Sequence, residues 1–169
     1  LSGDAHHSEY PSERDRCMKY ISGFTGSAGT VMVTADGGAF LVTDGRYTIQ
    51  ASQELDTSKW KVMQVGARMP TMPEHLRSAL GSGPQRIGVD ASTISLGTWR
   101  SLEKELHPHK LIALDESPLA VQWEADAVFT RPALPTAPAA EHPIEYAGVS
   151  AGDKLAQLRE ALEKEGADA

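Results

Sequence analysis

GFTGSAGTVMVTADGGAFLVTDGRY, residues 23–47, is the stretch that decides the fold. It opens with a loop of small residues, 23–29, and glycine at that density indicates backbone that takes positive φ or passes close to other groups. Two runs rich in β-branched and apolar residues follow, TVMVT at 30–34 and AFLVT at 39–43, and each is predicted to be a strand. The intervening ADGG, residues 35–38, carries the Asp-Gly chemistry of a tight turn. We therefore predict an antiparallel β-hairpin.

The second strand runs directly into TDGRY, residues 43–47, where the pattern changes to a helical one. Asp44 is predicted to cap that helix, because its carboxylate can accept hydrogen bonds from the free amides of the first turn. The helix is expected to continue to about Leu55, with Tyr47, Ala51 and Leu55 on one face.

Arg46 is unusual at this place, since a cation in the first turn meets the positive end of the helix dipole at a cost of about 0.3 to 1 kcal/mol. Two explanations are open. An internal ion pair, with Asp44 or a neighbouring glutamate, would offset the cost. Alternatively, the guanidinium is presented to a carbonyl or carboxylate of a ligand, and in open α/β sheets ligands gather at strand ends of this kind.

The rest of the chain alternates strands with helices. Together with the hairpin, this alternation predicts an α/β fold, a mixed sheet with helices on both faces. In the helix that Ser95 is expected to cap, Leu96, Trp99 and Leu102 (or Leu106) should face inward. Strands are predicted at 61–65, 86–89 (compact and buried) and 110–114, and helices at 12–21, 74–80, after Ser95, and at 117–123.

The composition changes from Thr130 onward. Residues 130–149 are rich in proline, which indicates an extended connector. A helix follows, with Ser150 and Asp153 as members of a capping box and Leu155, Leu158 and Leu162 at helical spacing. One amphipathic helix cannot bury its apolar face alone, so we expect it to dock elsewhere or to fray. The predicted domains are 1–129, 130–149 and 150–169.

Composition restricts the class of protein. The chain has 169 residues, 40% of them hydrophobic, enough for one core that buries roughly 70% of the unfolded surface. A formal charge of −7 without a cluster of lysine and arginine argues against nucleic acid or an anionic membrane as a partner. The single cysteine, Cys17, fits a reducing compartment. No apolar run approaches the ~20 residues of a membrane span.

Other motifs do not carry a site. His6, His7 and Glu9 match none of the spacings of a zinc site, and His107-Pro108-His109 follows a helix, so both groups are predicted to be loops. Ser27 lacks the glycine two positions before it that a nucleophile elbow requires. We therefore assign no catalytic residue and no metal ligand to this chain.

Several of these segments closely resemble the amino-terminal domain of the cytosolic-type, three-domain aminopeptidase P family of Xaa-Pro aminopeptidases, which has the creatinase/prolidase N-terminal fold. The resemblance spans nearly the whole chain and includes the region of Trp123. The segments are SGDAHHSEY (2–10), ISGFTGSAGTVMVT (21–34), TDGRYTIQA (43–51), RIGVDASTIS (86–95) and YAGVSAGDKLAQLREAL (146–162).

The resemblance implies that the chain is a fragment. Leu1 to Asp4 would be the exit of a strand, preceded by a helix and an apolar strand, and the helix after Ser150 would open a second domain. In such enzymes two divalent metals, commonly manganese, and the catalytic histidine lie in a carboxy-terminal domain, which this sequence lacks. The parent would be a cytoplasmic homodimer that removes the amino-terminal residue preceding proline.

Within that parent, the resemblance implies that this domain walls off the active-site cleft and packs on the second and catalytic domains. Arg46, in the family's Thr-Asp-Gly-Arg-Tyr segment, would contact bound peptide. The alternative is a protein-interaction module, because some relatives of this architecture have lost catalysis and bind histones or other proteins. The sequence of the carboxy-terminal domain would distinguish a domain of an active aminopeptidase from a protein-interaction module.

Overall fold

The computed structural model describes residues 4–6, 8 and 10–167. The expectation for residues 1–3, and the loop predicted at His7 and Glu9, lie outside the described residues. The chain divides into two compact units, Leu1–Leu134 and Pro135–Ala169. The predicted domain boundaries at 129 and 149 stay predictions.

The hairpin is confirmed. β1 (Thr30–Val33) pairs antiparallel with β2 (Ala39–Asp44), with Val31 opposite Leu41. The turn is closed by hydrogen bonds from Thr34 N to Gly38 O (2.8 Å) and from Gly37 N to Thr34 O (3.0 Å). Gly37 has a φ of 92°, a conformation that costs glycine little and other residues more.

The strands form two sheets. β3 (Trp60–Val65) pairs parallel with β2, which gives a three-stranded mixed sheet in the order β1-β2-β3. β4 (Arg86–Asp90) pairs parallel with β5 (Lys110–Leu114) in a two-stranded sheet. The predicted mixed α/β class is confirmed, but the described strands do not join into one continuous sheet.

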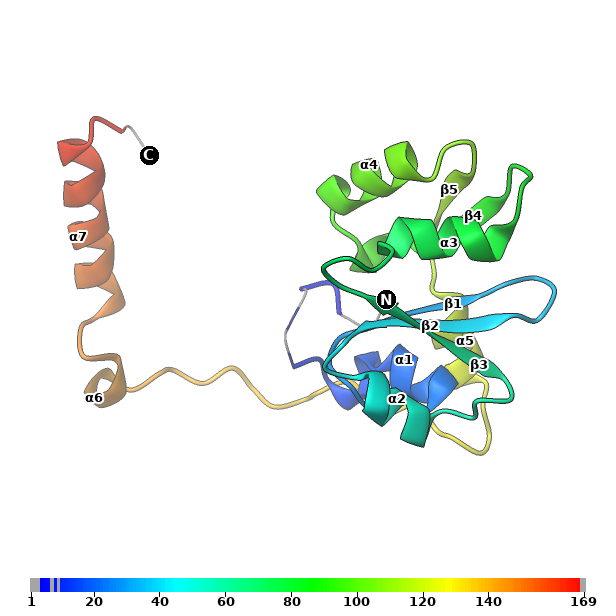
Figure 1. The fold of residues 1–169 in the computed structure, drawn as a ribbon. Helices are drawn as coiled ribbons and strands as arrows, with labels where there is room; N and C mark the ends of the chain where they lie inside the picture. Colours follow the sequence, from blue (N-terminus) through cyan, green and yellow to red (C-terminus); the bar gives the residue numbers. More distant parts are fainter. Residues whose placement is uncertain (1–3, 7, 9, 168–169) are drawn as a thin grey trace. The chain divides into compact units, whose positions relative to one another are not determined.

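Helices lie on both sides of the β1–β3 sheet (Figure 1), with α1, α2 and α5 on one side and α3 on the other. The α-helices of this unit are α1 (Cys17–Ser22), α2 (Thr48–Glu54), α3 (Met72–Leu80), α4 (Leu96–Glu105) and α5 (Pro118–Glu124), and the 3₁₀ turns are η1 (Glu13–Asp15) and η2 (Ala91–Thr93).

Two apolar clusters form the core. The first cluster contains Phe24 and lies around β2 and α2. Ala51 and Leu55 are buried in it, as expected from the predicted apolar face of that helix. The second joins α3, α4 and β5. Neighbouring residues of β1 pack against different clusters, because successive side chains of a strand point to opposite faces. The buried members are Met18, Phe24, Leu41, Ala51 and Leu55 in the first cluster, with Val31 packed against them, and Leu76, Leu102, Leu106 and Leu111 in the second, with Met32 packed against them.

Helix ends follow local capping chemistry. Gly23 ends α1 with a φ of 79°, the left-handed conformation that glycine favours at this position. Ser95 caps α4 as predicted, because its hydroxyl accepts a hydrogen bond from Thr98 N at 3.1 Å. α3 begins at Met72, two residues before the prediction, because Thr71 and Glu74 form a reciprocal capping box.

Three sequence predictions are wrong in detail. Asp44 does not cap α2, which begins only at Thr48, because the Asp44 carboxylate is occupied by Arg46. Leu96 does not face inward. It is 64% exposed because the inward side of α4 is formed by Leu102, with Leu106 just beyond the helix. β4 is not buried, since its residues are exposed or half-buried.

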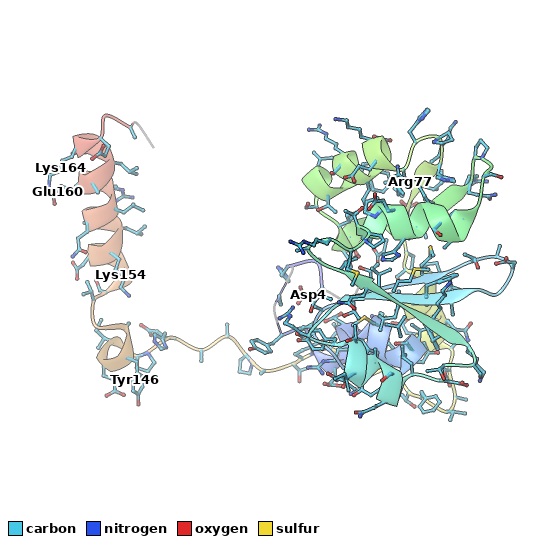
Figure 2. All side chains as sticks on the ribbon, in the orientation of Figure 1. Asp4, Arg77, Tyr146, Lys154, Glu160 and Lys164 are labelled. Atoms are coloured by element: carbon cyan, nitrogen blue, oxygen red, sulfur yellow. The ribbon has the colours of Figure 1, made fainter. Side chains whose placement is uncertain are left out.

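The second unit contains α6 (Ile144–Ala147) and α7 (Ala151–Lys164). Ser150 caps α7 by accepting a hydrogen bond from Asp153 N at 3.1 Å, and its hydroxyl donates to the Asp153 carboxylate at 2.7 Å. Figure 2 labels Lys164 and Glu160, which pair at 2.9 Å one turn apart.

The apolar side of α7 is open. Leu155 and Leu158 are exposed and Leu162 is half-buried. Since packing of an apolar face supplies most of the stability of a helix in a protein, we expect the amides of α7 to exchange with deuterium far faster than those of β2. Equal protection of α7 and β2 in hydrogen-exchange mass spectrometry would show instead that α7 belongs to a stable core.

Within the described part of the chain, no helix is long and apolar enough to cross a membrane.

Candidate functional site

Arg46 lies where β2 ends and before α2 begins. Its guanidinium forms a two-point ion pair with Asp44, from Nε to Oδ1 at 2.9 Å and from Nη2 to Oδ2 at 2.8 Å. The Arg46 backbone N–H also donates to Asp44 Oδ1 at 3.0 Å. The internal partner of the first explanation is therefore present. Contact with a ligand stays a prediction.

The pair is oriented but open to solvent. The Arg46 side chain is 70% exposed and that of Asp44 is 31% exposed. Arg46 Nη1 forms no hydrogen bond to any residue that the structure describes. The guanidinium is thus held on one side by Asp44, while its outer end remains available to an acceptor.

The ion pair lowers the pKa of the Asp44 carboxyl, first because the Arg46 guanidinium donates to it and second because the Arg46 backbone N–H does. A carboxyl with a lowered pKa in the folded state stabilises the fold above the pKa of the unfolded chain. This contribution is lost as the pH falls through the folded-state pKa. Because both side chains are accessible to water, the contribution is small.

Tyr47 connects Arg46 to the glycine-rich loop. The Arg46 guanidinium carbon lies 5.1 Å from the centre of the Tyr47 ring. The Tyr47 hydroxyl lies 2.6 Å from Ser27 Oγ, in the loop before β1, and the Tyr47 ring packs edge-on against Phe24. The sequence analysis considered Ser27 only as a nucleophile and missed this contact, because no spacing rule relates the two positions.

A second set of hydrogen bonds fixes the glycine-rich loop to α2. The Glu54 carboxylate accepts from Thr25 Oγ1 at 2.6 Å and from Thr25 N at 2.8 Å, and Gln50 Nε2 donates to Thr25 Oγ1 at 2.9 Å. The Thr25 hydroxyl is the largest cause of the lowered pKa of Glu54. The glycine-rich loop and α2 are therefore joined by hydrogen bonds close to Arg46.

The remaining candidates have structural partners. His109 is buried and its Nδ1 accepts a hydrogen bond from Gln85 N at 3.2 Å. The His6 backbone N–H donates to Asp4 at 3.0 Å. Among the described residues, no three His, Cys, Asp or Glu side chains gather closely enough to hold a metal ion.

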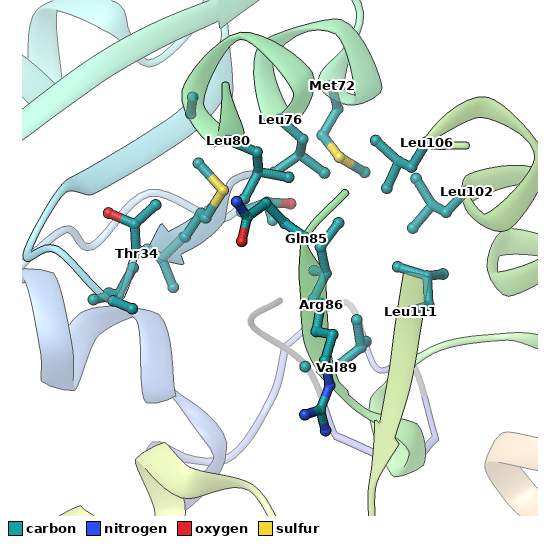
Figure 3. Close-up of a pocket in the computed structure, with 18 of the residues that line it drawn as sticks. Thr34, Met72, Leu76, Leu80, Gln85, Arg86, Val89, Leu102, Leu106 and Leu111 are labelled. Atoms are coloured by element: carbon teal, nitrogen blue, oxygen red, sulfur yellow. The ribbon is translucent and has the colours of Figure 1, made fainter. Parts of the chain in front are cut away.

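The structure also contains a cavity that the sequence analysis did not predict. A space of about 520 Å³ is lined by β1, α3, β4 and α4. Figure 3 shows Leu76, Leu102 and Leu106 around it, with Arg86 and Val89 of β4. Its walls are mainly apolar, it lies on the α3 and α4 side of the sheet, and Arg46 is not among the residues that line it.

The hairpin followed by a parallel strand, the helices on both faces and the Asp44–Arg46 pair at a strand end define an α/β domain with a candidate ligand-binding edge. A family model described as the Creatinase/Prolidase N-terminal domain matches residues 13–121. The chain belongs to this family.

Relatives of known name are much longer than this chain. A probable Xaa-Pro aminopeptidase P from Laccaria bicolor is 40% identical over 171 residues, which cover 99% of this chain and 26% of that protein. A second, from Paracoccidioides lutzii, is 39% identical, over 96% of this chain and 26% of that protein. The chain thus spans about a quarter of the length of these relatives.

A solved structure has the same fold. The X-prolyl aminopeptidase from Caenorhabditis elegans, described as a cytosolic enzyme with a di-nuclear active site, superimposes with a TM-score of 0.79 at 32% identity. The match covers 99% of this chain and 26% of that enzyme.

Proposed function

We propose that this chain is the non-catalytic amino-terminal domain of an Xaa-Pro aminopeptidase, which removes the amino-terminal residue that precedes proline. The observation that carries the proposal is the match of 99% of the chain to 26% of a probable Xaa-Pro aminopeptidase P. In this proposal the domain limits access to the active site, and Arg46 contacts the bound peptide.

The catalytic chemistry would lie outside this chain. The described residues offer no set of three clustered metal-ligand side chains. We therefore place the divalent metals, two manganese ions in this proposal, in a separate catalytic domain of the parent protein. There they would activate water for attack on the peptide carbonyl. The parent is proposed to be cytoplasmic and homodimeric.

We expect the purified 169-residue chain not to hydrolyse Xaa-Pro peptides, with or without added manganese. The longer protein, prepared in the same way, should release the amino-terminal residue. Release of that residue by the 169-residue chain, verified free of host peptidases, would show that the chain is itself catalytic. An inactive longer protein would contradict the proposed parent activity.

Replacement of Arg46 in the longer protein tests its proposed role. A charged donor stabilises a hydrogen-bond acceptor by about 1.5 to 3 kcal/mol, so Arg46→Ala should lower kcat/KM by roughly 10- to 150-fold. Arg46→Lys keeps the charge but not the planar fork and should recover only part of the loss.

The matched control is Lys59→Ala, which removes an exposed ion pair with Asp56 in the same unit. It should leave kcat/KM near the parent value. If Arg46 serves only its pair with Asp44, Arg46→Ala lowers the melting temperature slightly and leaves kinetics unchanged. A folded Arg46→Ala variant with normal kcat/KM would remove Arg46 from the site.

A further inference from the structure

A small pocket lies between α1 and the glycine-rich loop, and it is called the Arg16 pocket below. It has a volume of about 220 Å³, and its lining includes Arg16 and Lys19 at the start of α1 together with Thr25 and Ser27 of the loop. Sites for whole small molecules usually measure about 300 to 1,000 Å³. The Arg16 pocket is therefore suited to one side chain or one terminal group of a larger ligand.

The lining combines cations with buried apolar side chains. Met18 and Phe24 also line the pocket, and both are buried. Among the described residues of the lining, none carries a carboxylate, although the chain as a whole has a formal charge of −7. A ligand group with an apolar stem and an anionic end matches such a lining, because the apolar surface covers the stem and the cations neutralise the charge.

One carboxylate beside the pocket neutralises part of its positive charge. Glu13 Oε2 accepts a hydrogen bond from Lys19 Nζ at 3.0 Å, and Glu13 Oε1 lies 3.2 Å from Arg16 Nε. The hydrogen bond from Lys19 lowers the pKa of Glu13, and the charge of Arg16 lowers it further. Glu13 is therefore ionised at neutral pH, and the two cations with this one carboxylate keep a net positive charge.

Arg16 has donors that the described part of the chain does not satisfy. Its Nε atom is buried, and its contact with Glu13 is an ion pair without a hydrogen bond. No hydrogen bond joins the Arg16 guanidinium to any residue that the structure describes. Buried polar atoms without a partner are rare in native proteins and often indicate a bound ion or ligand group. An anion in the pocket would give the guanidinium the acceptor that it lacks.

The Arg16 pocket is connected to Arg46 by a short row of contacts. Ser27 lines the pocket, and its Oγ lies 2.6 Å from the Tyr47 hydroxyl. The Arg46 guanidinium carbon lies 5.1 Å from the centre of the Tyr47 ring. An extended peptide that contacts Arg46 can therefore run past Tyr47 and place a later residue in the pocket.

We propose that the Arg16 pocket is a second anion subsite, which holds a carboxylate of the peptide while Arg46 contacts another part of the same peptide. The carboxylate is that of an acidic side chain or of the carboxy terminus. Arg16 and Lys19 form charge-assisted hydrogen bonds to it, and Met18 and Phe24 contact its apolar stem. This inference rests on the proposed function, because the peptide is the substrate of the Xaa-Pro aminopeptidase.

Matched peptides test the subsite in the longer protein. Ala-Pro-Ala-Ala-Gln with a free carboxy terminus, Ala-Pro-Ala-Ala-Glu amide and Ala-Pro-Ala-Ala-Gln amide carry a terminal carboxylate, a side-chain carboxylate and no carboxylate. At least one carboxylate peptide should have a KM about tenfold lower than the neutral peptide. This is the low end of the range for charged hydrogen bonds, because both cations are partly exposed. The kcat values should be similar, since the carboxylate stays bound during the reaction.

Replacement of both cations should abolish the preference. In the Arg16→Gln/Lys19→Gln variant, the KM of the preferred carboxylate peptide should approach that of the neutral peptide. The control variant, Lys61→Gln/Arg100→Gln, removes two exposed cations that do not line the pocket, and it should keep the preference. Equal loss of the preference in both folded variants would indicate long-range attraction and would overturn the inference.

Peptide binding to the 169-residue chain gives a readout that does not depend on catalysis. In NMR titrations, at least one carboxylate peptide should shift the amide signals of Thr25, Gly26 and Ser27, and the neutral peptide should shift them much less. Shifts with inorganic phosphate but with none of the peptides would overturn the inference, because the pocket would then take a free anion. An inactive longer protein whose 169-residue chain shows the peptide shifts would contradict the proposed function only. An active longer protein with equal KM values for the three peptides would contradict the subsite only.

Discussion

Phe24→Ala is expected to lower the free energy of unfolding of the Leu1–Leu134 unit by about 3 to 5 kcal/mol. Phe24 is completely buried and packs with Met18, Leu41 and Leu55 in the first core cluster. Its removal leaves a cavity between the glycine-rich loop, α1, β2 and α2. The melting temperature should fall by about 6 to 20 °C.

Phe129→Ala is the matched control, because Phe129 belongs to the same unit and is 67% exposed. It should change the melting temperature little. A shift for Phe24→Ala no larger than that of Phe129→Ala would mean that Phe24 does not anchor the first cluster. Urea unfolding followed by circular dichroism gives an independent measurement of the same free energy.

Leu106→Ala is expected to lower the free energy of unfolding by about 2 to 5 kcal/mol. Leu106 is fully buried just after α4, where it joins α3 and β5 in the second cluster. The exact loss depends on how far the neighbouring side chains can collapse, since one wall of this cluster borders the open cavity.

Leu96→Ala provides the comparison at the start of α4, because Leu96 is 64% exposed. The two leucines are chemically identical and differ only in burial. Nearly equal losses in calorimetry, with Leu96→Ala as costly as Leu106→Ala, would contradict the assignment of Leu106 to the core.

Much of the fold could be predicted from local sequence. The hairpin followed from β-branched runs around an Asp-Gly turn, and β5 was predicted at its observed bounds. The start of α4 followed from Ser95, because serine capping is a contact within one turn. These features depend on residues close together in the chain.

Features that depend on distant residues were less predictable. The inward face of α4 was predicted to include Leu96. Helical periodicity alone does not tell which of two overlapping rows of apolar side chains on α4 packs against α3 and β5. β4 was predicted to be a compact buried strand, but the burial of a strand depends on which distant elements cover its faces. The division into two sheets has no local signal at all.

The candidate site was predictable in part. The position of Arg46 at a strand end and its alternative partner Asp44 were both apparent from the sequence. The structure assigns the Asp44 carboxylate to Arg46 instead of to the first turn of α2, because the arginine supplies three donors to it. The spacing of the residues alone does not tell whether Arg46 or the backbone amides of the first turn of α2 bind the Asp44 carboxylate.

The hydrogen bonds that join Thr25 to Glu54 and Ser27 to Tyr47 have a mechanical consequence for the end of β2 where Arg46 lies. They link the loop before β1 to both ends of the segment that contains Arg46 and α2. A force applied to the guanidinium, or a tilt of α2, is therefore transmitted to the loop through short, stiff connections. The loop and α2 should therefore move as a single rigid body.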